Sequence, residues 1–503
     1  MSFIPVILWS DALVFLLLAA CIASAWYIRR REHLLLPWRR VGQSATAMVS
    51  LLVLSLFVLV GLLDTLHYRA ALPEAAGGEK VYSPEVLSVF DKLVEPLRLQ
   101  TEKTYSAPFA VTLYAKESVT DAQGSVLREY PRLRYGGAHL TDVSQRDGDV
   151  MKRALVGALA GWLAGLLLVA ISSLIKPLAI RLSPQAGKPL VIRRRPESSD
   201  TKSHREAAQR GCVRFAKYLI AWIPACAGRA DSKARCSVVV ALMIFAALIG
   251  ATLHLATAYH VLGTDKVGQD VLYLSLKSVR TGLIIGTVTT LVTLPLALLL
   301  GIAAGYLRGW VDDVIQYIYT VLSSIPSVLL IAAAVLMMQV TIETHPQWFD
   351  TSASRADLRL VFLCLILGMT SWTGLCRLLR GETLKLRELE YIQAAQAFGV
   401  SSFRILTRHI VPNVMHIILI ALVMDFSALV LAEAVLSYVG VGVDPSTISF
   451  GTMINAARME MGREPMVWWA LMAAFCFMLV LVLAANLFAD AVRDAFDPRL
   501  NRT

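Results

Sequence analysis

The sequence predicts an all-α membrane protein that crosses the bilayer many times. Of its 503 residues, 56% are hydrophobic and 17% are charged, and the mean hydropathy is +0.60, whereas a typical soluble domain is about 25% charged. A membrane-spanning helix needs about 20 predominantly apolar residues. Nine segments are long and apolar enough, namely residues 6–28, 44–63, 153–175, 237–259, 281–305, 315–340, 359–378, 413–437 and 467–489.

The first two segments set the orientation. Residues 6–28 are interpreted as a retained helix, because no basic residue precedes them as in a signal peptide. Three arginines, 29–31, follow directly. Since positive charge accumulates on the cytoplasmic side, residues 29–43 are placed inside and the N-terminus outside, so the helix 44–63 returns outward.

Residues 64–152 are predicted to form a small external (periplasmic) domain. They contain eleven Lys and Arg against thirteen Asp and Glu, which is far from the basic excess of a cytoplasmic loop. Proline, glycine and the alternating stretch 109–114 favour a mixed α/β or strand-containing fold. Such a domain could be a lid, a docking surface for a partner or a spacer.

The helix predicted at 153–175 returns to the cytoplasm and carries Gly157, Gly161 and Gly165. Small residues at every fourth position allow two membrane helices to approach closely. Tight packing against another helix is therefore expected, although glycine is common in membrane helices in general.

Residues 176–236 are predicted to be a basic cytoplasmic linker. They contain fourteen Lys and Arg against four Asp and Glu, an excess of ten that nearly equals the net charge of +11 for the whole chain. The positive-inside rule explains this excess near anionic lipid. The alternative, nucleic-acid binding, requires a folded basic module with interleaved aromatic residues, so no nucleic-acid partner is expected.

A glycine-containing motif, LGTDKVGQDV, precedes the predicted helix 281–305. In it, Gly263 is expected to allow a tight turn, Thr264 to cap the following helix, and Asp265 to favour the positive end of that helix. The orientation places this motif outside. It is either a helix cap only or part of an external docking surface, and its candidate residues are Gly263, Thr264, Asp265, Gly268 and Asp270.

The polar segment 380–412 lies between two apolar segments and is predicted to form two short helices. Gly399 is expected to end the first helix with a positive φ. Ser401 or Ser402 is expected to cap the second, and Pro412 to end it. From the pattern alone, an ordinary loop between spans is equally compatible. The inner faces are expected to be formed by Leu389, Ile392 and Ala395 in the first helix and by Phe403, Leu406 and Ile410 in the second.

The predicted span 413–437 contains two carboxylates, Asp425 and Glu433. A charged side chain at the bilayer centre costs roughly 3 kcal/mol on insertion scales, so such residues usually face a cavity or a partner. Eight residues are about two helical turns, which lets both point the same way. Together with Ser437 they are candidates for a translocation path. The alternative is a protonated or hydrogen-bonded structural role, which we favour for Asp425.

The segment 380–412 resembles the coupling loop of binding-protein-dependent ABC importer permeases. The pattern of that family is Glu-Ala-Ala, three residues, Gly, ten residues, Ile, one residue and Pro. In this chain Gln takes the place of Glu, and the spacing is otherwise intact. The matching residues are Gln393, Ala394, Ala395, Gly399, Ile410 and Pro412.

Further motifs strengthen the resemblance, which covers about 237–503. The external motif resembles the signature Leu-Gly-Thr-Asp-x-x-Gly-Arg-Asp-Val of peptide-type permeases, with Gln269 in place of Arg. Glu433 matches the Glu of an Ala-Glu-Ala-x-Leu-Ser motif, and residues 491–500 resemble the terminal segment of the peptide and nickel permeases. The chain is thus similar to the C-type subunit of this group.

The resemblance implies a type I importer permease core of six transmembrane helices in the bacterial cytoplasmic (inner) membrane, with about three extra N-terminal spans. It implies four kinds of partner: a homologous second permease, two ABC ATPase subunits, an extracytoplasmic substrate-binding protein and membrane lipid. ATP and Mg would bind to the ATPase subunits. This chain has no Walker A motif, and it is expected to bind no cofactor or metal and to be no enzyme.

Two alternative functions remain from the sequence. A proton-coupled secondary transporter could use Asp425 and Glu433, but it would favour inverted repeats with broken helices, and no such repeat is visible. A non-transporting scaffold could present residues 64–152, but this leaves the coupling-loop pattern unexplained. Uptake by membrane vesicles, with ATP supplied and the ATPase subunits present or absent, separates these functions.

The orientation can be tested by labelling single cysteines with a membrane-impermeant reagent on a cysteine-free background. Ser125→Cys, in the predicted external domain, should react in intact cells. Ser203→Cys, in the basic linker, should react only after lysis. The reverse result at Ser125→Cys would contradict the predicted topology.

Overall fold

The structure, a computed structural model, confirms an all-α polytopic membrane protein. Its described part contains nine helices long and apolar enough to cross a membrane. The central stretch of the predicted linker 176–236 lies outside this part, including the run Arg193–Asp200. The residues described are 3–30, 32–71, 82–120, 126–181, 232–348 and 351–496.

The long helices follow the predicted spans closely, although several extend beyond them. The helices that contain the nine candidate spans are α1 (Trp9–Arg29), α3 (Ala45–Asp64), α6 (Arg146–Arg181), α8 (Ser232–Ala256), α9 (Val271–Leu307), α11 (Ser327–Thr344), α12 (Ser352–Arg387), α15 (Val411–Val439) and α17 (Trp469–Phe496).

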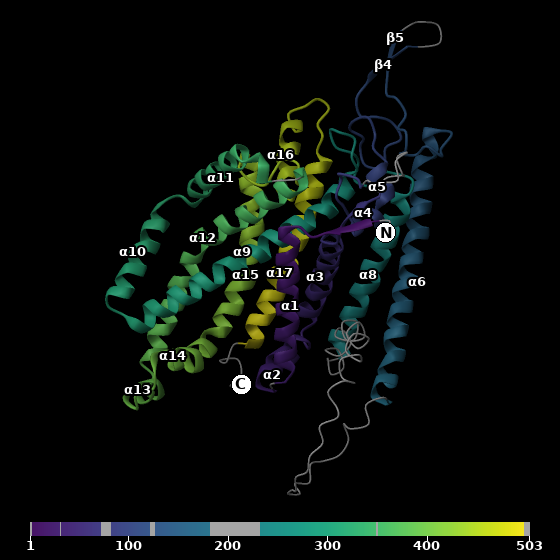
Figure 1. Cartoon of the computed structure of the whole chain (residues 1–503). Coiled ribbons are helices and arrows are strands. Elements are labelled where there is room, and N and C mark those ends of the chain that lie inside the picture. Colours follow the sequence, from purple (N-terminus) through teal and green to yellow (C-terminus); the bar gives the residue numbers. More distant parts are fainter. Residues whose placement is uncertain are drawn as a thin grey trace.

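Short elements lie between the long helices. The three-stranded antiparallel sheet β1-β2-β3 joins the N-terminus to the segment after α3, with Phe3 opposite Ala70. The two strands of a hairpin, β4 and β5, project from the predicted external domain (Figure 1). These elements are β1 (Phe3–Val6), α2 (Glu32–Val41), β2 (His67–Ala70), β3 (Leu87–Ser88), α4 (Val89–Leu93), α5 (Glu95–Leu99), β4 (Glu117–Thr120), β5 (Val126–Glu129), α10 (Trp310–Ser324), α13 (Glu390–Ala397), α14 (Ser402–Ile405) and α16 (Phe450–Glu460).

The two ends of the helical bundle carry different segments. Helices α13 and α14 lie at one end of the bundle, where α2 also lies (Figure 1). The β4–β5 hairpin, α5 and α16 lie at the other end (Figure 1). At the second end, Tyr114 of the predicted external domain donates a hydrogen bond to the carbonyl of Met466, at 3.2 Å. The described parts of residues 29–43 and 64–152, which the charge pattern assigns to opposite sides of the membrane, thus lie at opposite ends of the bundle (Figure 1).

The span predicted at 315–340, in which Pro326 is expected to cause a kink, is divided into two separate helices. The chain forms α10 and then α11, and Ile325 between them is extended with φ −89° and ψ 132°. Pro326 causes the break, because a proline disfavours helical geometry in the residue before it and provides no N–H for the helix. Pro295, in contrast, lies inside the continuous helix α9.

One face of α9 holds the extra N-terminal elements against the core. Arg280 contacts Asp11 of α1 at 2.7 Å, and Lys277 contacts Asp91 of α4 at 2.6 Å. Tyr273 also donates a hydrogen bond to Asp91, at 2.8 Å. Residues spaced by four and three positions share a helix face, so a single stripe of α9 joins both segments.

Helices α6 and α8 pack through glycines, as the spacing of the α6 glycines predicts. A Cβ on Gly157 would lie 2.6 Å from the carbonyl oxygen of Gly250, and a Cβ on Gly161 would lie 2.1 Å from that of Ala246. Backbone therefore touches backbone, a contact that only residues without a side chain allow.

We predict that Gly161→Leu lowers the thermal stability of the detergent-purified protein, since overpacking of this kind typically costs about 1–3 kcal/mol. The matched control is Gly148→Leu on the same helix, where a Cβ would meet nothing within 4 Å. Equal melting temperatures for the two variants would show that the α6–α8 contact contributes nothing.

Candidate functional site

The coupling segment, residues 380–412, is more helical than the sequence predicts. Residues 380–387 continue α12, and α13 follows as a separate helix. Ser401 is the residue before α14, although its side chain makes no capping hydrogen bond. The expectation that Pro412 ends the second helix is wrong, because the chain continues from α14 through a π-helical turn, Leu406–Ile410, into α15.

The π-helical turn explains how a proline is accommodated there. Proline has no N–H to donate, so it fits where a helical hydrogen bond is already missing. A π turn shifts the hydrogen-bond pattern by one residue, and Pro412 lies at the first positions of α15, immediately after that turn. The tip of the coupling segment is thereby joined rigidly to a transmembrane helix.

Gly399 forms the turn between α13 and α14. Its φ is 72°, the positive value that the sequence predicts. Its N–H donates to the carbonyl of Gln396 at 2.9 Å, and the N–H of Val400 donates to that of Ala395 at 3.1 Å. A Cβ at Gly399 would meet nothing within 4 Å, so the backbone conformation alone selects glycine at this position.

The inner faces of the two short helices differ in part from the prediction. Ile392 and Ile410 are fully buried, as expected, but the second helix buries Ile405 in place of Phe403. Phe403 is 76% exposed and Phe398, beside the turn, is 86% exposed. The helix face could not be assigned from the sequence because the π-helical turn interrupts the periodicity. Two solvent-exposed phenyl rings thus flank the turn at Gly399, which we call the tip of the coupling segment.

Two of the other residues of the coupling motif lie on the outer surface of α13, and the third packs against the core. Gln393 and Ala394 are exposed, and Ala395 is half-buried. The amide of Gln393 donates to the backbone carbonyl of Glu388 at 3.3 Å. The small side chain of Ala394 leaves this surface flat, so another surface could approach it closely.

Salt bridges hold the base of the coupling segment to the core. Arg380 binds both carboxylate oxygens of Asp312 in α10, at 2.6 and 2.8 Å. Arg387 donates to the carbonyl of Tyr306 at the end of α9, at 2.6 Å. A bidentate Arg–carboxylate pair fixes direction as well as distance. The base of the segment is therefore tied directly to α9 and α10.

The external motif caps α9, but through a different residue from the one predicted. Asp270 accepts hydrogen bonds from the N–H groups of Leu272 and Tyr273, at 2.8 and 3.3 Å. Asp265 instead closes its own turn, accepting from the N–H groups of Val267 and Gln269 at 2.9 and 2.8 Å. The side chain that caps the helix is thus the acid that directly precedes it.

Thr264 binds the predicted external domain. Its hydroxyl oxygen accepts a hydrogen bond from the N–H of Ser106 at 2.7 Å, and the hydroxyl donates to the carbonyl of Thr104 at 2.9 Å. The carbonyl of Thr264 accepts from the indole N–H of Trp469 at 2.9 Å. Thr264 is completely buried, so it joins the domain, the motif and α17.

The glycines of the motif are needed because the external domain lies directly on them. A Cβ on Gly268, where φ is 80°, would lie 1.9 Å from the carbonyl oxygen of Glu102. A Cβ on Gly263, where φ is 74°, would lie 2.5 Å from that of Ser106. The domain therefore covers the two glycines of the motif, which the sequence predicts to be either a helix cap or part of a docking surface.

A buried histidine, missed by the sequence analysis, completes this contact. His260 Nδ1 lies 2.8 Å from Asp270, and its Nε2 lies 3.4 Å from Glu102, within ion-pair distance but without hydrogen-bond geometry. Burial by itself lowers the pKa of His260, but hydrogen bonding to Asp270 and the charges of both carboxylates raise it to about 9. The imidazolium therefore links the domain to the helix cap.

Glu102 is adapted to this role. Burial raises its pKa, but His260 and the N–H groups of Arg134, Tyr135 and Gly136 lower it to about 2. The carboxylate is therefore ionised at neutral pH, and its opposite charge stabilises protonated His260. No signal in the sequence could have paired these residues, which are 158 positions apart.

Glu433 anchors the short helix α16. Its carboxylate accepts hydrogen bonds from the hydroxyls of Ser437 and Ser449, at 2.7 and 2.9 Å. Ser449 is the N-cap of α16, so the carboxylate faces the positive end of that helix. Asp425 does not join this network: it is half-buried, and no hydrogen bond or ion pair is found for it in the described part of the chain.

Comparisons with known proteins show to which family the chain belongs. Residues 297–502 match the family described as binding-protein-dependent transport system inner membrane component. The oligopeptide transport system permease protein OppC of Mycobacterium tuberculosis is 35% identical over 239 residues, which cover 48% of this chain and 76% of OppC. The chain belongs to this family.

Other relatives match over the same share of the chain. The dipeptide transport system permease protein DppC of Bacillus subtilis is 28% identical, over 49% of this chain and 71% of DppC. The glutathione transport system permease protein GsiD of Pectobacterium atrosepticum is 33% identical, over 48% of this chain and 73% of GsiD. A solved chain of the MetNI methionine ABC transporter is 16% identical, covers 45% of this chain and 98% of its own length, and has a TM-score of 0.33.

Family membership establishes the coarse function. The chain is a multi-pass protein of the bacterial inner membrane and a permease subunit of an ABC importer, and it is a transport subunit, not an enzyme. The matched relatives account for about half of the chain. The extra N-terminal elements and the external domain lie outside the residues that match the family, 297–502.

We predict that His260 stabilises the protein in a pH-dependent way. Its pKa of about 9 in the folded protein is above the ordinary value of 6.5 for a histidine. This shift corresponds to roughly 3 kcal/mol of folding free energy. A raised pKa contributes stability that is fully present below about pH 6.5 and is lost as the pH rises through about 9. The melting temperature of wild type should exceed that of His260→Gln at pH 6.5, and this difference should shrink by pH 10.

The control is His139→Gln, because His139 forms an ion pair with Asp149 but is 35% exposed. This variant should melt close to wild type at every pH. A melting difference between wild type and His260→Gln that stays constant from pH 6.5 to 10 would contradict the predicted link to Glu102 and Asp270.

Proposed function

We propose that this permease subunit imports peptides or similar small solutes, driven by ATP hydrolysis on partner subunits. The partners would be two ABC ATPase subunits, a homologous second permease and an extracytoplasmic binding protein. ATP and Mg would bind to the ATPase subunits. Relatives named for oligopeptide, dipeptide and glutathione transport support the peptide class.

The observation that carries the proposal is the exposed tip of the coupling segment. Phe398 and Phe403 are both more than three-quarters exposed, at the end opposite the external domain (Figure 1). Burying a phenylalanine side chain contributes roughly 1.5–3 kcal/mol, so a partner that covers both rings would gain considerable affinity. An aromatic anchor inserted into a pocket is a common source of binding energy between proteins.

The base of the segment supports coupling. ATP is hydrolysed on another chain, so the conformational change must cross a protein–protein contact. A salt bridge from Arg380 ties the segment to α10, and a hydrogen bond from Arg387 ties it to the end of α9. The π-helical turn continues into α15. A displacement at the tip would therefore act on several membrane helices together.

The proton-coupled alternative gains no support from the geometry. Asp425 and Glu433 do not share a hydrogen-bond network. The carboxylate of Glu433 accepts hydrogen bonds from two serine hydroxyls, and only 1% of the residue is exposed. This geometry fits a role for Glu433 in positioning α16 at the external end. Such a role does not depend on whether substrate passes beside Glu433.

We predict that Gly399→Asp gives normal membrane abundance but weak ATPase binding and strongly reduced uptake. An aspartate would be forced to a φ near 72°, and such a conformation costs on the order of 1–3 kcal/mol. Co-purification of the ATPase subunits and vesicle uptake would be measured. Phe398→Ala should weaken ATPase binding without backbone strain.

The matched control is Gly462→Asp, at a glycine of the opposite end where a Cβ also meets nothing within 4 Å and φ is not positive. It should bind the ATPase subunits and transport as wild type does. Normal uptake and ATPase binding by both Gly399→Asp and Phe398→Ala would show that this segment is not the coupling element.

A further inference from the structure

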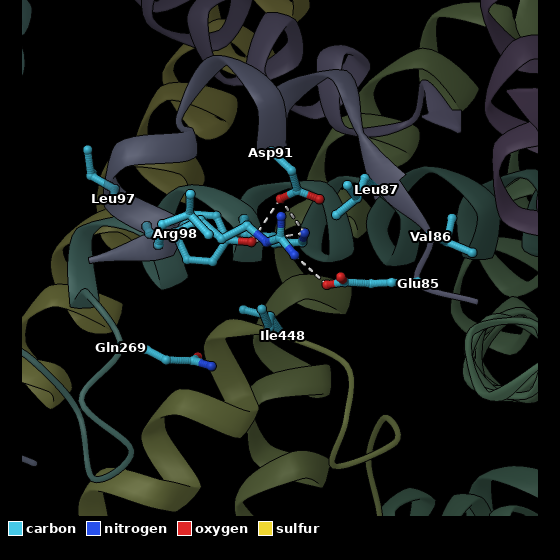
Figure 2. A pocket seen from close by; sticks show the side chains of 11 residues that line it. Glu85, Val86, Leu87, Asp91, Leu97, Arg98, Gln269 and Ile448 are labelled. Carbon is cyan, nitrogen blue, oxygen red and sulfur yellow. Dashed lines mark hydrogen bonds and ion pairs between the residues drawn. The ribbon is translucent and has the colours of Figure 1, made fainter. Parts of the chain in front are cut away.

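A cavity of about 320 Å³ lies between the external domain and the core. Its walls come from the segment that contains β3, α4 and α5, from the outer end of α9, and from the loop before α16 (Figure 2). A volume of this size is at the lower end of the range for small-molecule sites. Neither the coupling segment nor the capping role of the external motif requires such a cavity.

Two cations and two carboxylates line the cavity (Figure 2). Lys277 lies 2.6 Å from Asp91, and Arg98 forms an ion pair with Glu85. The four charges sum to zero but are separated in space. A ligand that carries only one sign of charge would leave an unmatched charge, whereas a dipolar ligand keeps the balance.

The two ion pairs differ in how easily they open. Asp91 is 2% exposed, and it also accepts hydrogen bonds from the hydroxyl of Tyr273 and the N–H of Ser88. Glu85, in contrast, is 62% exposed and Arg98 is 24% exposed. An exposed ion pair contributes little, because water solvates both partners. Arg98 can therefore exchange Glu85 for the anionic group of a ligand.

The rest of the wall is largely apolar. Leu87, Leu97 and Ile448 line it, and the amide of Gln269 from the external motif is the remaining polar side chain besides Tyr273. Apolar walls with a few oriented polar groups are typical of small-molecule sites. They fit a ligand with an apolar body between its charged groups.

We propose that this cavity binds a small zwitterion, a molecule with one anionic group and one ammonium group. Arg98 would bind the anionic group in a bidentate manner, and Glu85 would turn to the ammonium group. Lys277 and Asp91 would remain paired and form a polar base. Short peptides and the headgroup of phosphatidylethanolamine share this chemistry.

The cavity is placed where occupancy can affect the external end. Ile448 lies in its wall, and the carbonyl of Ile448 accepts a hydrogen bond from Thr281 of α9 at 2.7 Å. The next residue, Ser449, donates to Glu433 of α15. This site goes beyond the proposed import function, since it requires neither ATP nor a partner subunit.

The test is direct binding of the dipeptide alanyl-leucine to the full chain in nanodiscs of phosphatidylglycerol, measured by calorimetry. Wild type should bind it, and acetylating its N-terminus or amidating its C-terminus should weaken binding at least tenfold. Arg98→Gln and Glu85→Gln should each weaken binding at least fivefold. Both variants leave the buried Lys277–Asp91 pair intact.

The matched control is Lys103→Gln, which removes an exposed cation of the same domain that pairs with Glu117 at 2.7 Å. It should bind like wild type. Binding that survives unchanged in both Arg98→Gln and Glu85→Gln, or that is equal for the doubly blocked dipeptide, would overturn the site.

A second arm distinguishes the source of the ligand. In nanodiscs containing phosphatidylethanolamine, competition that disappears in Arg98→Gln would identify a lipid headgroup as an occupant of the same site. No competition would leave the soluble zwitterion as the occupant. Absence of dipeptide binding in the phosphatidylglycerol nanodiscs would overturn the proposal. ATP-driven uptake is measured separately, so its loss without loss of binding contradicts only the proposed import function.

Discussion

The attachment of the extra N-terminal elements to the core depends on the ion pair between Arg280 and Asp11. Arg280 sits on α9 with 12% of its side chain exposed, and Asp11 is completely buried. Removing one partner of a buried ion pair typically costs about 3–5 kcal/mol, because the other charge is left without a partner in a low dielectric. Charge pairing at the outer end of the bundle therefore requires α1 and α9 to stay together.

The same constraint extends from this pair to the external domain. Lys277, one turn before Arg280, needs Asp91 for the same reason, and His260 is held between Glu102 and Asp270. The domain is thus attached to the core by buried ion pairs and by a backbone contact between Glu102 and Gly268. These contacts fix its position relative to the core. The external motif, which the sequence predicts to be a helix cap or part of a docking surface, is here part of the contact between the domain and the core.

The opposite end is built differently, and this difference suits its proposed role. Its links are partly exposed arginine salt bridges, such as the one between Arg380 and Asp312. Its tip exposes Phe398 and Phe403 in place of a closed hydrophobic core. Exposed aromatic rings above a firmly tied base allow a partner to push on the membrane helices without breaking their packing.

Local features of the sequence were predictable where they depend on neighbouring residues. The positive φ of Gly399 follows from its position after a short helix, and the close packing of α6 follows from its glycine spacing. Predictions failed where two local effects compete. Pro326 divided into two helices a span in which only a kink was expected. The π-helical turn at 406–410 follows a second helix in which Ile405 is buried and Phe403 is exposed.

By itself, the sequence determined the class of the fold and the family, and it predicted where the coupling segment lies, because apolar length, charge asymmetry and motif spacing are properties of contiguous residues. Only the tertiary structure decided that the domain covers the external motif, that Glu433 binds the N-terminus of α16, and that Arg98 and Lys277 line one cavity. These contacts join residues far apart in the chain, such as Ser106 and Thr264. Their pairing depends on how complete helices pack, which no local pattern encodes.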